Sequence, residues 1–137
     1  MKARVVDKAV AAVWLYLPQL DEEIAETVKT AAQQCGMTFG QFGPASAGMK
    51  LSDILSGSVQ SGLDTEIVPP KQPVLLMDGV DRAGLDRLLA ALRQGFGQKN
   101  LPGIALKAVV TPTNRSWRFD QLAKELQKEH EMMRKKG

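Results

Sequence analysis

One order of elements occurs twice in this chain of 137 residues. In each half, a short apolar run precedes an amphipathic segment and a second short run, which is the pattern of a strand, a helix and a strand. Shifting the first half by sixty positions places Asp21 on Asp81 and Val28 on Leu88. We interpret the pattern as an internal duplication within one domain. The alternative is that such units look alike only because they share the same patterning.

The predicted domain spans residues 1–137, and it divides into a pseudo-repeat at 8–57, a linker at 58–71 and a pseudo-repeat at 72–137. The linker is rich in Gly, Ser and Pro, a composition typical of a loop and not of a core element.

The first half is expected to contain a buried strand, a helix, a weaker strand and a short helix, at residues 12–17, 22–35, 38–42 and 50–55. Asp21 is placed to cap the first helix, and Gly36 is placed to end it. Gly40 and Gln41 dilute the apolar character of the second strand, so we expect that strand at an edge of the sheet.

The second half is expected to repeat this order, with strands at 74–77 and 104–111, a helix between them and a final helix at 117–136. Asp81 is placed to cap the helix between the strands, and Gly95 and Gly97 are placed to end it.

Two strand–helix–strand units in one small domain predict an α+β fold. We expect a ferredoxin-like sandwich with strand order 4-1-3-2, all helices on one face and an additional C-terminal helix. The first and third strands are the most continuously apolar, which favours central positions for them. A doubly wound parallel α/β sheet is the alternative.

Charge and cysteine content restrict the partners and the compartment. The formal charge is +3, which is too small to indicate a polyanionic partner, so we do not expect nucleic acid. Cys35 is the only cysteine and cannot form an intramolecular disulfide, which is typical of a reducing compartment. The longest apolar run, residues 9–17, is too short for a membrane helix. We therefore expect a cytoplasmic protein that does not bind a membrane.

The sequence carries no catalytic signature. It contains no glycine-rich phosphate loop, no nucleophile elbow and no cluster of Cys and His with zinc-binding spacing. His130 lies among charged residues and is expected on a solvated helix face, and Cys35 is expected as a small core residue. We expect no cofactor, no bound metal and no catalytic residue.

The most distinctive stretch is KAVVTPTNRSW at residues 107–117, where a predicted strand enters a polar turn and then a helix. Such junctions commonly bind anions and small ligands, because free backbone N–H groups converge there. The candidate ligand-binding residues are Lys107, Thr111, Thr113, Asn114 and Trp117. The alternative is that the turn residues only cap a helix and that the lysine protects an edge strand.

The final helix has a narrow apolar seam at Phe119, Leu122, Leu126 and Met133. This seam packs either on the sheet of the same chain or against a partner chain. We expect the second arrangement to produce a homo-oligomer.

Two further functions rest on single features. Trp14 and Tyr16 share one face of the first strand, so an open sheet could stack single-stranded RNA on them. A small enzyme would use Lys107, Thr111 and Asn114 together.

The K-A-x-x-T-x-T-N-x-x-W pattern of residues 107–117, with the preceding PVLLMDGV and LDRLLAALR and the following FDQLAKELQKEH, resembles the bacterial domain-of-unknown-function 3783 family. The resemblance covers about residues 72–130 and departs from the family pattern at Arg118, where the family has threonine. It implies a bacterial, cytosolic protein and no particular reaction. We predict a non-enzymatic module that senses a small ligand or binds a protein partner.

Overall fold

The computed structural model of the chain describes residues 11–57 and 67–136. The elements follow in the order β1 (Ala12–Tyr16), α1 (Glu22–Gln34), β2 (Thr38–Phe42), the 3-10 helix η2 (Pro44–Ser46), α2 (Leu51–Leu55), β3 (Val74–Asp78), α3 (Arg82–Gln98), β4 (Leu106–Val109), the 3-10 helix η3 (Asn114–Ser116) and α4 (Phe119–Lys136). The same order of strand, helix, strand, 3-10 turn and helix thus occurs in both halves. Residues 8–10 of the first pseudo-repeat and 58–66 of the linker lie outside the described residues, and a common origin of the halves stays a prediction.

The four strands form one mixed sheet in the order β2-β1-β3-β4. β1 is parallel to β2 and β3 is parallel to β4, whereas β1 and β3 are antiparallel, with Trp14 opposite Leu76. The fold is therefore α+β, and the central places of the first and third strands and the edge position of the second are confirmed. The antiparallel central pair rules out the doubly wound parallel sheet.

The expected strand order 4-1-3-2 is wrong, because β4 pairs with β3 and not with β1. A ferredoxin-like order requires each helical crossover to skip one strand position. Here each crossover joins neighbouring strands, so β1 and β3 are left to pair with each other at the centre.

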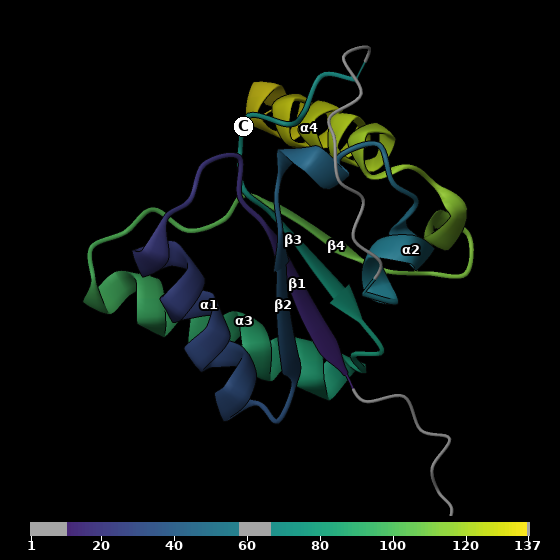
Figure 1. Cartoon of the computed structure of the whole chain (residues 1–137). Helices are drawn as coiled ribbons and strands as arrows, with labels where there is room; N and C mark the ends of the chain where they lie inside the picture. The colour runs from purple at the N-terminus through teal and green to yellow at the C-terminus, as the bar shows by residue number, and fades with distance from the viewer. Residues whose placement is uncertain (1–10, 58–66, 137) are drawn as a thin grey trace, which may run out of the picture.

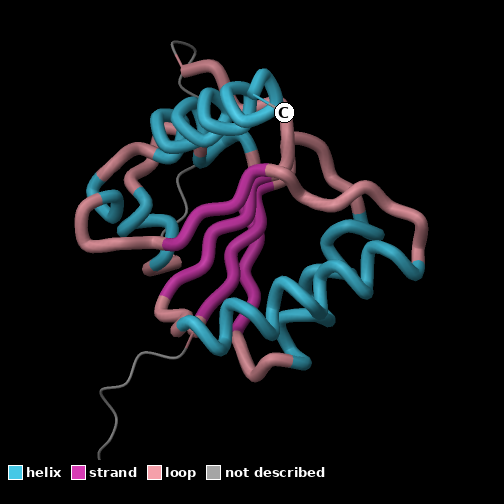
Figure 2. The backbone as a smooth tube through the Cα atoms, turned by 180° about the vertical axis from the view of Figure 1, so that it is seen from behind, coloured by secondary structure: helices cyan, strands magenta, loops and turns pink. Residues whose placement is uncertain are grey.

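The expectation that all helices lie on one face is also wrong. Figure 1 and the reverse view in Figure 2 show α1 and α3 on one face of the sheet and α2 and α4 on the other. Each face has its own core: Val13 and Leu15 of β1 pack with α1 and α3, whereas Tyr16 packs with α2 and α4. Since the central strands are apolar on both faces, each face needs a helical layer to exclude water.

The segments that lead into α2 and α4 pair with each other. Lys50 and Arg118 form an isolated antiparallel bridge. The Leu51 N–H donates to the Trp117 carbonyl at 2.9 Å, and the Phe119 N–H donates to the Met49 carbonyl at 2.9 Å. These two equivalent bonds fix the starts of both helices against one another.

The predicted helix caps are confirmed. The Asp21 carboxylate accepts from the Ile24 N–H at 3.1 Å, and the Asp81 carboxylate accepts from the Gly84 N–H at 2.6 Å. Gly36 follows α1 with a φ of 73°, a left-handed conformation that glycine adopts without strain.

The prediction that Gly95 and Gly97 end the second long helix is wrong, because α3 continues to Gln98. A Cβ on Gly95 would lie 2.9 Å from Cγ2 of Thr27 in α1. Gly95 therefore serves the close approach of two helices. The left-handed residue after α3 is Asn100, with a φ of 58°.

Two other elements differ from the prediction by more than one residue. β4 is limited to Leu106–Val109 instead of residues 104–111, and α4 begins at Phe119 instead of residue 117. Trp117 has extended backbone, with a φ of −75° and a ψ of 151°, because it belongs to the segment that pairs with the start of α2.

Candidate functional site

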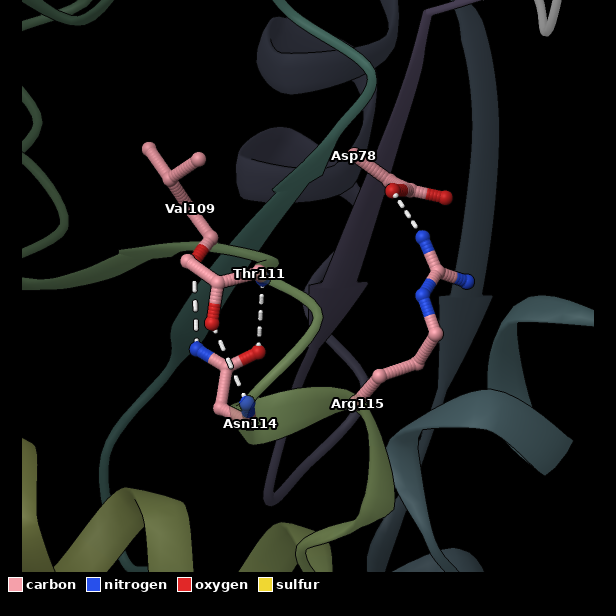
Figure 3. A network of polar contacts seen from close by, with 5 residues as sticks. All are labelled: Asp78, Val109, Thr111, Asn114 and Arg115. Atoms are coloured by element: carbon pink, nitrogen blue, oxygen red, sulfur yellow. Dashed lines mark hydrogen bonds and ion pairs between the residues drawn. The ribbon is translucent and has the colours of Figure 1, made fainter.

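The predicted ligand-binding turn is closed by its own side chains (Figure 3). The Thr111 N–H donates to Oδ1 of Asn114 at 2.8 Å, and the Asn114 N–H donates to Oγ1 of Thr111 at 3.1 Å. Nδ2 of Asn114 donates to the Val109 carbonyl at 3.1 Å. Because the amide uses both its oxygen and its nitrogen inside the turn, the geometry favours the structural interpretation of these two residues.

The next residue joins this turn to the end of β3. Nη2 of Arg115 lies 2.7 Å from Oδ1 of Asp78, and a dashed line in Figure 3 marks this ion pair. Thr113 is exposed and its side chain makes no capping bond, and Trp117 is 37% exposed. The turn region thus holds four of the five predicted ligand residues.

The fifth residue, Lys107, lies apart from the turn. It pairs in register with Leu75, so its side chain is on the sheet face that α1 and α3 cover. Its Nζ donates to the Ile104 carbonyl, before β4. Burial lowers the pKa of the Lys107 ammonium from its ordinary value of 10.5. The predicted enzyme site required Lys107 to lie beside Thr111 and Asn114, and the structure does not bring these residues together.

Lys107 borders a groove between α3 and β4, with a volume of about 270 Å³. The residues of this α3–β4 groove are Leu89, Leu92, Arg93, Phe96, Gly103, Ile104 and Lys107. Its walls are mainly apolar, and its two charged groups are both cations.

Arg93 was not among the predicted site residues. Its position immediately after Leu92, at the border of the apolar stripe, was the available signal, but the exposed Arg87, immediately before Leu88, has a similar position in α3. Only the packing of α3 against β4 shows which of them borders a groove.

A larger groove, of about 690 Å³, lies where β1 ends. Two of its polar groups already have partners in the described structure: the hydroxyl of Tyr16 donates to the Pro70 carbonyl at 2.8 Å, and the Asp21 carboxylate caps α1. The α3–β4 groove is the better candidate, because cations from two different elements border its apolar wall and neither is in an ion pair among the described residues.

The predicted seam of the final helix is divided. Phe119 is fully buried and Leu122 is 4% exposed, both in the core between α4 and the sheet, and Leu126 packs at its margin. In this structure these residues therefore pack in the core of their own chain. Met133, at 74% exposed, faces solvent together with Met132.

The aromatic face of β1 is covered. Tyr16 has no exposed surface, and its ring lies 4.9 Å from that of Phe119, centroid to centroid. Trp14 is half-buried, and its ring lies where a side chain on Gly40 would be. The open sheet that RNA stacking would need is thus absent from the described structure.

Within residues 11–57 and 67–136, no group of three or more His, Cys, Asp or Glu side chains is arranged to hold a metal ion. Among the helices of the described residues, none combines the length and the apolar character needed to cross a bilayer.

The family comparison concerns the half of the chain that contains the α3–β4 groove. Residues 73–133 match the model of DUF3783, a domain of unknown function. The match confirms the resemblance predicted from the second half. The match begins just before β3 and ends within α4, so the matched region contains every residue of the groove and of the turn at Thr111. No curated protein and no solved structure matches the chain.

Proposed function

We propose that this protein is a non-enzymatic module that binds a small ligand in the α3–β4 groove. The observation that carries the proposal is the position of Lys107, an ammonium with no carboxylate partner among the described residues, at the side of an apolar groove. Small-molecule sites are concave and mainly apolar, with a few polar groups that fix the orientation of the ligand. The α3–β4 groove has this composition.

The surrounding contacts are suited to binding. Leu92, Phe96 and Ile104 are each more than nine-tenths buried and form a packed wall, so the groove has a fixed shape before any ligand arrives. At the opposite end of β4, the Thr111–Asn114 bonds close the turn, and the Arg115–Asp78 pair joins it to the end of β3. A preformed site of this kind loses little entropy on binding.

The test is native mass spectrometry of the freshly purified protein and of the variant Gly103→Leu. Gly103 lines the groove, and a Cβ there would meet no heavy atom within 4 Å, so the variant is expected to fold and to occupy ligand space. We expect a small-molecule adduct on the wild type that is lost in Gly103→Leu.

Gly97→Leu is the matched control. A Cβ at Gly97 also meets nothing within 4 Å, and this residue of α3 is outside the α3–β4 groove. The adduct should persist in this variant. An adduct that survives in both variants would place the ligand elsewhere, and a wild type that remains free of adduct and binds no member of a metabolite panel would contradict the proposal.

A second function, protein interaction in a homo-oligomer, is supported by the exposure of Met132 and Met133, which are 61% and 74% exposed. Exposed large apolar side chains can mark an interaction surface. We expect Met133→Glu to give a folded species of lower mass in size-exclusion chromatography with light scattering. An unchanged mass would exclude this surface as the interface.

A further inference from the structure

The α3–β4 groove combines two cations with an apolar wall, and this combination restricts the chemistry of its ligand. Arg93 comes from α3 and Lys107 from β4, so positive charge borders the groove from both elements. No Asp or Glu within residues 11–57 and 67–136 lines it. The ion pairs of the described residues are Arg115–Asp78, Arg118–Asp120 and Lys128–Glu125, and none of them involves either cation.

We infer that the α3–β4 groove takes a small organic anion, a carboxylate joined to an apolar group, with the carboxylate held between Arg93 and Lys107. This inference rests on the proposed function and names the class of ligand for the same site. Charge-assisted hydrogen bonds from an arginine and a lysine to one carboxylate are among the stronger polar contacts in proteins.

The state of Lys107 agrees with an anionic ligand. Its ammonium is bonded to the neutral Ile104 carbonyl, and burial lowers its pKa because the charge is partly withdrawn from water. A bound carboxylate would supply the missing counter-charge. The pKa of Lys107 is therefore expected to rise when the ligand binds.

The rest of the groove determines the other part of the ligand. Leu89, Leu92 and Phe96 of α3 and Ile104 before β4 offer apolar surface, which favours an apolar body over a sugar or a phosphate ester. The volume of about 270 Å³ is just below the usual range for drug-sized ligands, so the body is small.

The test uses three probes on the full chain, measured by calorimetry and by NMR shifts at the groove residues. 4-Phenylbutanoate has the predicted carboxylate and apolar body, 4-phenylbutanamide is its neutral analogue, and acetate lacks the apolar body. We expect the butanoate to bind at least about tenfold more tightly than either of the others, which corresponds to about 1.4 kcal/mol.

The protein variants are Arg93→Gln and Lys107→Gln, each expected to weaken butanoate binding by about tenfold or more, because each removes a charged hydrogen bond. Lys99→Gln is the control. Lys99 is exposed at the end of α3 and is outside the groove, so it tests the effect of net charge alone. Binding that is equally weakened by Lys99→Gln would overturn the inference.

The other outcomes separate the inference from the proposed function. If the amide shifts the groove residues and binds as tightly as the butanoate, the ligand class is wrong and the groove remains a binding site. If acetate binds as tightly as the butanoate, the prediction that the ligand carries an apolar group is wrong. If no probe shifts the groove residues, the inference fails, and the proposed function is then decided by the Gly103→Leu experiment.

Discussion

The packing of α1 against α3 predicts how the substitution Gly95→Ala will change the stability. The added Cβ would lie 2.9 Å from Cγ2 of Thr27, a side chain that is only 3% exposed. Overpacking of this kind costs about 1–3 kcal/mol. Alanine in a helix interior is favoured over glycine by about 1 kcal/mol. The net effect is therefore a loss of about 0–2 kcal/mol.

Thr27→Ser removes the methyl group that causes the clash and keeps the hydroxyl, which donates to the Glu23 carbonyl at 2.7 Å. In that background Gly95→Ala is expected to stabilise the protein by up to about 1 kcal/mol, because the helix preference then acts alone. The two effects differ by about 1–3 kcal/mol, which is within the range of coupling between residues in contact.

Urea unfolding of the wild type, both single variants and the double variant measures this coupling. The reasoning depends on one close contact, so it is refuted if Gly95→Ala changes the free energy of unfolding equally in both backgrounds. A fall of α3 helicity in the Gly95→Ala variant would also contradict it, because the expected cost lies in packing and not in helix formation.

Two further predictions follow from single contacts. Asn114→Ala should lower the free energy of unfolding by about 1–2 kcal/mol in urea, because it removes the side-chain bonds to Val109 and Thr111, whereas Thr113→Ala should change it by less than about 0.5 kcal/mol. Equal losses would contradict the structural role of Asn114. Burial raises the pKa of Tyr16 from 10.0 to about 12, so an absorbance titration should show a late phenol. As the pH rises, the Tyr16 phenol ionises first in the unfolded state. The contribution of buried, neutral Tyr16 to stability is therefore complete below pH 10 and is lost toward pH 12. A phenol that titrates near pH 10 in the folded protein would refute the burial.

Local signals in the sequence predicted most elements of the fold. Asp21, Asp81 and Gly36 act within a few residues of their own positions, so their capping roles could be predicted without tertiary contacts. The same local reasoning was wrong for Gly95, which was predicted to end a helix. Glycine is needed there because Thr27 of another helix lies too close for a side chain.

The candidate site was predicted only in part. Lys107 was identified from its position in a strand, and Thr111 and Asn114 were identified as turn residues with two open interpretations. Their hydrogen bonds favour the structural interpretation, and no spacing in the sequence shows that both the oxygen and the nitrogen of the Asn114 amide are bonded within the turn. Arg93 becomes a candidate only because α3 packs beside β4.

By itself, the sequence determined the α+β class, the central places of the first and third strands, the edge position of the second strand and the likeness of the second half to DUF3783, because these depend on local patterns of apolar residues and on a short motif. Only the tertiary structure decided the strand order and the distribution of the helices over two faces. The apolar strands β1 and β3 are central both in the expected order 4-1-3-2 and in the observed order β2-β1-β3-β4, so their composition does not distinguish the two orders. Whether a crossover joins neighbouring strands or skips one depends on packing between segments far apart in the chain.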